Sequence, residues 1–366
     1  MKPFRELRVS IYRTFKFGAI RLTVLWLGVS LIATGAAATT IQQTEAPSAA
    51  SANAGTTAKA RPKASAAARA RARAARIRAA RAKSARSAKA LAEAKTPHFR
   101  TDAAGNVVPD VRAAAAIIYD PATGKILYEE NAMDERSIAS ITKVMTAIVF
   151  LESTTDLSQE VTIERSDTLR ASTTYLKTND RVRVSDLLHL LLIPSDNAAA
   201  RALARISPLG SDGFIARMNS KADDLGLNQT AYTDPSGLLN DNISSAYDMA
   251  RLIAFASEDD RIGPVMRTPE YSFRTAKGRI ITIRSTNQIL RAGDIDVRGG
   301  KTGFISKAGY CLATLLKMPH GGPSLAVVVL GATSSVGRFW ETRHLMAWLA
   351  ERGFLGLTAP VVATAK

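Results

Sequence analysis

The sequence is poor in the residues on which many catalytic centres depend. It has one cysteine and four histidines in 366 residues. A single cysteine, Cys311, excludes an intramolecular disulfide and a cysteine-rich zinc site, and its apolar surroundings predict a buried strand residue. No H-E-x-x-H zinc-protease pair and no G-x-S-x-G nucleophile elbow occur. We therefore expect no metal and no cofactor.

Positive charge is unevenly distributed along the chain. The formal net charge is +17, of which residues 1–21 contribute +5 and residues 45–97 contribute +11, leaving only +1 elsewhere. The chain from residue 98 onward is thus nearly neutral. Its composition gives no reason to expect a polyanionic partner for that part.

The N-terminus has the layout of an export signal. Basic residues 1–21 precede the apolar run "LTVLWLGVSLIATGAAA", which ends in small residues. This layout predicts a signal peptide over residues 1–38, cleaved at Ala36-Ala37-Ala38. The alternative is an uncleaved anchor, because the 17-residue run is at the lower limit for a membrane span. Both interpretations place the remainder outside the cytoplasm, and we expect a periplasmic protein.

Residues 39–109 read as a low-complexity linker rich in alanine, arginine and lysine. They present no apolar face, so they cannot build a packed core, although alanine and arginine favour local helix. We expect a charged, extended linker. A sharper hypothesis is an electrostatic tether to anionic membrane lipids or a wall polymer. Nucleic acid is not expected as a partner, because of export and because the basic run over 45–97 has no aromatic residues for base stacking.

Residues 110–354 have the pattern of a folded domain, followed by a short tail over 355–366. "AAIIYD" and "ILYEE" flank a turn and predict a hairpin, and a helix with one buried face follows from residue 141. Helical patterns fill about residues 165–250, and strands and a last helix come after them. The order predicts an α/β (α+β) fold, with an antiparallel sheet flanked by helices and an inserted helical subdomain.

Three short motifs in this domain together suggest a serine nucleophile. They are Ser140-x-x-Lys143, then Ser195-Asp196-Asn197, then Lys301-Thr302-Gly303. Each is weak alone, but the ordered triplet is the pattern of penicillin-binding proteins and class A β-lactamases. Asp196 is expected to be a loop and cap residue, and His189, within "LLHLL", a packed helix residue.

The motifs make chemical sense as one site. A lysine one helical turn after a serine can reach its hydroxyl, and the helix start favours developing negative charge there. Lys143 has to be neutral to act as a base, which burial or a second cation such as Lys301 would promote. Ser195 can relay a proton to the leaving amine, and Asn197 can bind a substrate carbonyl and a lysine amine.

The strand edge "GGKTG" is expected to hold the substrate. Its small residues allow a peptide to pair as an added strand. Lys301 and Thr302 would meet the substrate carboxylate. The N–H groups of Ser140 and Phe304 would form the oxyanion hole.

At these residues the chain resembles low-molecular-mass penicillin-binding proteins, the serine D-alanyl-D-alanine peptidases. "LGLNQTAYTDPSGL", "STNQIL" and "GGKTGFISKAGYCLA" extend the resemblance over about residues 110–354. It implies a β-lactamase/transpeptidase-like fold, acylation of Ser140 by peptidoglycan stem peptides, and inhibition by β-lactams. Phe304 stands where the carboxypeptidases commonly have histidine, so the chain looks closer to the D,D-endopeptidase branch.

Two alternatives stay open within this resemblance. One is a D,D-carboxypeptidase of the same family. The other is a class A-like β-lactamase, since "DLGLN" from Asp224 to Asn228 resembles the E-x-x-L-N pattern with aspartate in place of glutamate. The latter is disfavoured because the segment continues a helix and leads directly into "DPSGL".

Overall fold

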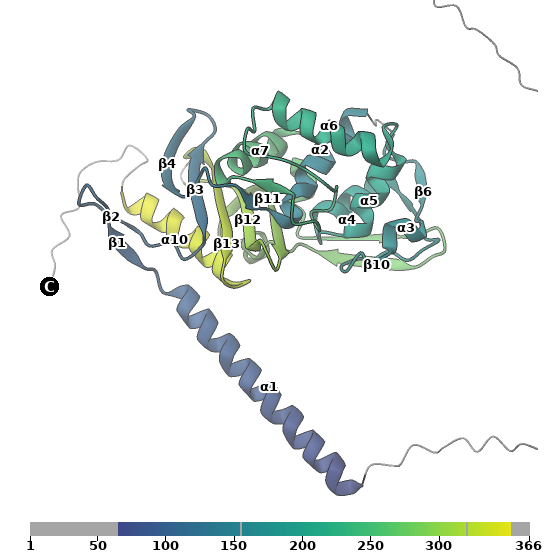
Figure 1. Ribbon diagram of the computed structural model, residues 1–366, viewed down its shortest axis with the longest axis horizontal. Helices are drawn as coiled ribbons and strands as arrows, with labels where there is room; N and C mark the ends of the chain where they lie inside the picture. Colours follow the sequence, from purple (N-terminus) through teal and green to yellow (C-terminus); the bar gives the residue numbers. More distant parts are fainter. Residues whose placement is uncertain (1–64, 154–155, 320, 353–366) are drawn as a thin grey trace, which may run out of the picture. The chain divides into compact units, whose positions relative to one another are not determined.

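The structure, a computed structural model, describes residues 65–153, 156–319 and 321–352 (Figure 1). The predicted signal segment, the linker as far as residue 64 and the predicted tail lie outside the described residues. None of the helices in the described ranges combines the length and apolarity needed to cross a membrane.

A five-stranded antiparallel sheet forms the centre of the domain, in the order β11-β12-β13-β3-β4. Its strands are β3 (Ala115–Asp120), β4 (Lys125–Glu130), β11 (Asp296–Ile305), β12 (Gly309–Lys317) and β13 (Ser324–Ala332). The predicted N-terminal hairpin does join the C-terminal strands, and Cys311 is buried in β12. β11 is an edge strand, so one side of "GGKTG" remains unpaired within the sheet.

Helices cover both faces of this sheet (Figure 1). Ile118, Val327 and Val329 face α10 (Gly337–Glu351), while Ile117 and Val328 face the larger core beneath α7 (Ala246–Glu258). Successive side chains in a strand point to opposite faces, so two covered faces require strands that are apolar throughout. Every residue of β3 is accordingly buried.

The helical subdomain is inserted between the two halves of the sheet, as predicted. The remaining helices of the domain are η1 (Ala139–Thr142), α2 (Lys143–Ser153), α3 (Arg165–Thr168), α4 (Val184–Leu192), α5 (Asn197–Ile206), α6 (Gly210–Asp224), α8 (Gly263–Met266) and α9 (Gln288–Ala292). His189 packs within the fold, its ring 3.9 Å from that of Tyr271.

Short strand pairs complete the domain. They are β5 (Arg136–Ser137) with β8 (Ile243–Ser244), β6 (Glu160–Thr162) with β7 (Arg181–Arg183), and β9 (Glu270–Arg274) with β10 (Ile280–Arg284). Of these short strands the sequence patterns predicted only β10.

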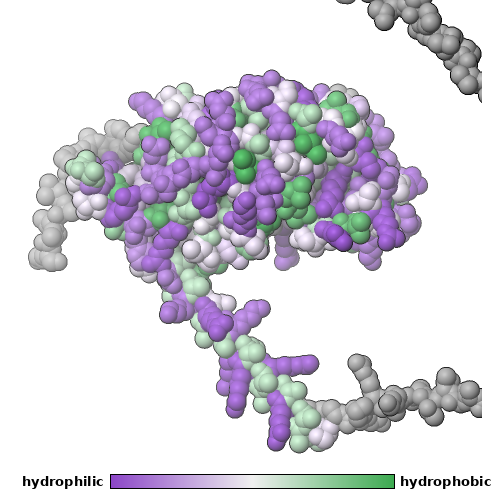
Figure 2. All heavy atoms as spheres, in the orientation of Figure 1, coloured by the Kyte–Doolittle hydropathy of each residue, from purple (hydrophilic) through white to green (hydrophobic). Residues whose placement is uncertain are grey.

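The predicted linker needs two corrections. Residues 66–95 form a helix, α1 (Ala66–Lys95), rather than an extended chain, because alanine and arginine are strong helix formers and Ser65 caps the first turn. Figure 2 shows hydrophilic side chains projecting along it. The folded domain also begins before residue 110. β1 (Phe99–Thr101) pairs with β2 (Val107–Pro109), and Trp348 Nε1 donates to the Val107 carbonyl at 3.2 Å.

Candidate active site

Ser140 lies in a short 3₁₀ turn, η1, that leads directly into α2. Two glycines allow other segments to approach it closely. A Cβ on Gly237 would lie 2.0 Å from the Ala139 carbonyl oxygen, and one on Gly303 would lie 2.7 Å from the Ile138 carbonyl oxygen. Both contacts are too short for any side chain. The backbone of the predicted nucleophile is therefore enclosed by glycine on two sides.

Lys143 is fully buried, with its amine at the centre of three polar contacts. Its Nζ lies 2.9 Å from Ser140 Oγ, 2.6 Å from Asn197 Oδ1 and 2.5 Å from the Ser236 carbonyl oxygen. Burial lowers the pKa of Lys143 to about 7, although the negative charges of Asp234 and Asp196 oppose that shift. The amine thus changes protonation state near neutral pH.

The expectation that Lys301 would lower this pKa needs revision. Burial is the largest cause, and the cation that adds to it is Arg201. Repulsion between the two lysines instead affects Lys301. Burial, and after it the charge of Lys143, hold the pKa of Lys301 well below its ordinary value. Lys301 is fully buried and donates to the Thr302 carbonyl at 2.8 Å.

The "DPSGL" segment, residues 234–238, positions the Ser236 carbonyl that accepts a hydrogen bond from Lys143. Asp234 accepts hydrogen bonds from the N–H groups of Ser236 and Gly237 through Oδ1 and from Leu239 N–H through Oδ2. These bonds close a tight turn in which Gly237 has a φ of +75°. The turn fixes the Ser236 carbonyl against the lysine amine, a role that the sequence did not reveal.

The Ser195-Asp196-Asn197 segment joins α4 to α5. Ser195 has a φ of +68°, and its buried Oγ has no hydrogen-bond partner among the described residues. Asp196 caps α5 by accepting from Ala199 N–H at 3.0 Å, as expected. Burial raises the pKa of its carboxyl group. Asn197 donates through Nδ2 to the Ala171 carbonyl at 2.7 Å, which leaves its Oδ1 directed at the lysine.

The strand edge carrying Thr302 and Gly303 runs beside η1. Thr302 Oγ1 lies 2.6 Å from Thr286 Oγ1. Arg338 of α10, which faces the same cavity as Gly303, donates through Nη1 to the Gly303 carbonyl at 2.8 Å and to the Cys311 carbonyl at 3.2 Å. Burial lowers the pKa of Arg338 to about 10. No motif spacing pointed to this arginine.

These segments enclose a cavity of about 230 Å³. The predicted site residues that line it are Ser140, Ser195, Asn197, Thr302, Gly303 and Phe304. Lys143 and Lys301 are buried behind that lining. The Phe304 side chain is 50% exposed and stacks on Tyr310 with ring centroids 4.2 Å apart. All eight predicted residues thus gather at one place.

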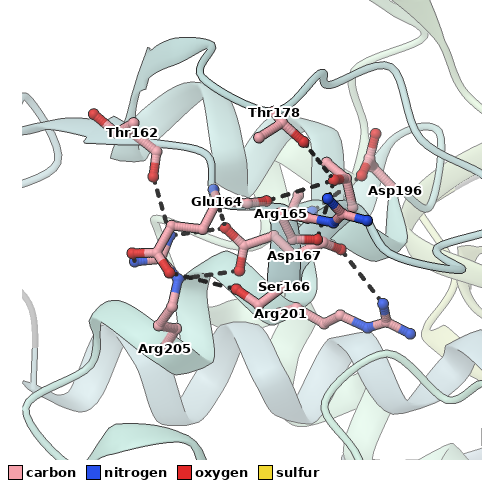
Figure 3. A network of polar contacts seen from close by, with 11 residues as sticks. Thr162, Glu164, Arg165, Ser166, Asp167, Thr178, Asp196, Arg201 and Arg205 are labelled. Carbon is pink, nitrogen blue, oxygen red and sulfur yellow. Dashed lines mark hydrogen bonds and ion pairs between the residues drawn. The ribbon is translucent and has the colours of Figure 1, made fainter. Parts of the chain in front are cut away.

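A polar network joins α3 to α5, the helix that begins at Asn197 (Figure 3). Arg205 of α5 donates to both carboxylate oxygens of Asp167 in α3, at 3.1 and 2.8 Å, and to Glu164 at 2.9 Å. Arg201 donates to the Leu169 carbonyl at 2.6 Å. The network binds α3, and the segment that follows it, to the same helix that begins at Asn197.

Comparison with known proteins agrees with this arrangement. A sequence model described as D-alanyl-D-alanine carboxypeptidase, peptidase family S11, matches residues 102–334. The chain belongs to this family. Its members are serine peptidases that act on the D-Ala-D-Ala stems of peptidoglycan.

Curated relatives in this family include endopeptidases. The D-alanyl-D-alanine endopeptidase of Escherichia coli is 31% identical over 261 residues, covering 70% of this chain and 82% of the relative. That of Pseudomonas aeruginosa is 32% identical, covering 66% and 78%. Among solved structures, the Streptomyces K15 DD-transpeptidase matches with a TM-score of 0.62 and 30% identity, covering 66% of this chain and 97% of its own.

The structure also shows where Asp224 lies, the first residue of the segment that resembled a β-lactamase loop. Asp224 ends α6 and forms an ion pair with Arg217 at 2.9 Å. Neither residue lines the cavity that contains Ser140. Asp224 is therefore a surface residue in this chain and has no place beside the nucleophile.

Proposed function

We propose that this S11 peptidase is a periplasmic D,D-endopeptidase that cleaves peptidoglycan cross-links through an acyl-enzyme on Ser140. β-Lactams would acylate the same oxygen. The observation that carries the proposal is the contact set of Lys143. A neutral lysine amine has two N–H donors and one lone pair. Asn197 Oδ1 and the Ser236 carbonyl can accept the two donors, which leaves the lone pair for the Ser140 hydroxyl.

In the first step, Lys143 takes the hydroxyl proton while Ser140 Oγ attacks the carbonyl carbon of the penultimate D-alanine. The N–H groups of Ser140 and Phe304 stabilise the oxyanion from two adjacent backbone segments. Ser195, whose Oγ has no other partner among the described residues, passes the proton to the leaving amine. Water then attacks the ester and releases the shortened stem.

The substrate lies as an added strand along the open edge of β11. Thr302 meets the carboxylate that follows the scissile bond, and Lys301, buried behind the cavity lining, holds the Thr302 carbonyl in place. Arg338 supports this edge by holding the Gly303 carbonyl. A rigid edge keeps the scissile carbonyl within reach of Ser140.

The endopeptidase assignment rests on two observations. Phe304 takes the position after Lys301-Thr302-Gly303 at which the family's carboxypeptidases commonly have histidine, and the relatives from E. coli and P. aeruginosa are endopeptidases. The second candidate is a D,D-carboxypeptidase, a function carried by other relatives that are similarly identical to this chain.

Purified protein can separate these functions. We expect a fluorescent penicillin to label the wild type but not Ser140→Ala, because the acyl bond forms on that oxygen. Incubation with cross-linked muropeptide dimers should yield monomers. Release of free D-alanine without dimer cleavage would make the protein a carboxypeptidase, and rapid turnover of penicillin would make it a β-lactamase.

We also propose that the basic helix α1 acts as an electrostatic tether. Its cationic side chains are exposed around the whole helix rather than on one face, with no apolar stripe for insertion into lipid. Such a helix can bind an anionic wall polymer or lipid headgroups through charge alone. Deletion of residues 45–97 should reduce retention in the wall or membrane fraction, and unchanged retention would contradict the tether.

A further inference from the structure

The proposed reaction fixes the direction in which a stem peptide lies along β11. The carboxylate that follows the scissile bond is at Thr302, and the scissile carbonyl is at the N–H groups of Ser140 and Phe304. The leaving group therefore extends away from Phe304. The part of the stem that stays on Ser140 as the acyl group continues the other way, past Phe304 and toward the turn between β11 and β12.

A second cavity, of about 470 Å³, lies at this turn. Phe304 lines both this cavity and the one that contains Ser140, so the two adjoin at its side chain. Residues 306–310 and residues 331–333, at the end of β13, contribute most of the remaining lining. An added strand advances about 3.3 Å per residue, in step with the strand that it pairs with. The two stem residues that precede the acylating D-alanine thus reach the turn and the second cavity.

The lining of the second cavity is positively charged. Its cationic side chains are Lys307, which is exposed at the turn, and Arg136, which is half-buried, and no aspartate or glutamate contributes to it. Neither cation forms an ion pair with a carboxylate of the described residues. Gly331 leaves room for the guanidinium, because a Cβ there would lie 3.1 Å from Arg136 Nη2. Both cations are accessible to an anionic group that enters beside Phe304.

We propose that this cavity is a subsite for the stem that acylates Ser140, in which Lys307 and Arg136 bind a free carboxylate that precedes the D-alanine pair. Peptidoglycan stems carry free carboxylates in this part, and the two cations supply the complementary charge. The inference rests on the proposed acyl-enzyme and deepens it by naming what is recognised upstream of the scissile bond. The acyl-donor stem is common to an endopeptidase and a carboxypeptidase, so the subsite does not depend on which bond is cut.

The test compares two stem peptides that differ only in charge. One has free carboxylates before its D-alanine pair, and in the other these carboxylates are amidated. Binding is measured by calorimetry with Ser140→Ala, in which no acyl bond can form. We expect the free stem to bind about 3- to 30-fold more tightly than the amidated stem, the range for ion pairs with two partly exposed cations. Adding Lys307→Glu should abolish most of this preference, because repulsion replaces attraction.

Lys277→Glu, at an exposed lysine outside both cavities, is the matched control and should retain the preference for the free stem. Equal affinities of the two stems, or a preference that survives Lys307→Glu, would overturn the subsite. So would an equal loss of affinity for both stems, since Lys307 would then act on the shape of the turn. Penicillin labelling and dimer cleavage test the proposed function separately. A clear preference supports the subsite even if no dimer is cleaved, and its absence refutes the subsite even in an active endopeptidase.

Discussion

Two cations of this domain, the half-buried Arg205 and the fully buried Lys143, are held in opposite ways. Arg205 meets the carboxylate of Asp167, so its positive charge is balanced. Lys143 meets a hydroxyl, an amide oxygen and a backbone carbonyl, all of them neutral. Accordingly, hydrogen bonding to Asp167 raises the pKa of Arg205, whereas burial lowers that of Lys143 to about 7.

The difference shows how one fold makes one cation structural and another reactive. A carboxylate partner fixes the charged form, because opposite charges stabilise each other in a low-dielectric interior. Neutral acceptors take hydrogen bonds from an amine but do not stabilise its positive charge as a carboxylate would. The aspartates nearest to Lys143 direct their oxygens at backbone N–H groups instead, as Asp234 and Asp196 do. The pKa of the Lys143 amine therefore lies near neutral pH.

Removing the reactive cation should have the largest effect. We expect Lys143→Met to slow acylation by fluorescent penicillin about 10²- to 10⁴-fold, the usual contribution of a general base. Methionine is close in size to lysine, so a thermal melt should show that the variant still folds. A loss smaller than about tenfold would mean that another group takes the Ser140 proton.

Placing a carboxylate beside Lys143 should stabilise its charged form, as Asp167 does for Arg205. Asn197→Asp would place a negative charge at the atom that now lies 2.6 Å from Nζ. An opposite charge this close raises a lysine pKa by about 1–3 units. The base acts only when neutral, so the acylation rate at pH 7 should fall about 10- to 100-fold.

The pH profile is the decisive readout for Asn197→Asp. In the wild type the acylation rate should rise with pH and level off above about 7, where Lys143 loses its proton. In the variant the rising limb should move to higher pH, so the rate recovers under alkaline conditions. A profile with an unchanged midpoint and a uniform loss would show that charge at this position does not control Lys143.

The reciprocal change, at the structural site, should affect stability and leave the chemistry nearly unaltered. Asp167→Asn removes the charge that faces Arg205, and we expect a loss of about 1–3 kcal/mol in the free energy of unfolding, measured by urea titration. Glu164→Gln is the matched control, because Glu164 is 55% exposed and should cost about 0.5 kcal/mol or less. A tenfold loss of acylation rate in folded Asp167→Asn would break the distinction between the two cations.

The sequence predicted what depends on local spacing. One helical turn separates Ser140 from Lys143, and short apolar runs predicted the strands that meet in the sheet. The ordered motifs identified the three segments that surround the cavity. β9 was missed because its exposed positions give it little apolar pattern.

What could not be predicted depends on contacts between distant segments. The Ser236 carbonyl is a backbone atom, so its place beside Lys143 follows from a turn and not from a side-chain type. Arg338 lies in a helix whose spacing to the motifs is set only by the folded sheet. The composition of α1 fitted both a helix and an extended linker, and only the structure distinguished them.

The glycines around Ser140 have a consequence for antibiotic escape. Gly237 and Gly303 leave no space for any side chain, so the backbone packed against the Ser140 turn cannot be reshaped by substitution at these two positions. A mutation that weakened β-lactam binding there would also displace the nucleophile that the wall-processing reaction needs. Resistance by point mutation in this enzyme should therefore arise at the rim, where Phe304 and Leu238 face the cavity with side chains that can change.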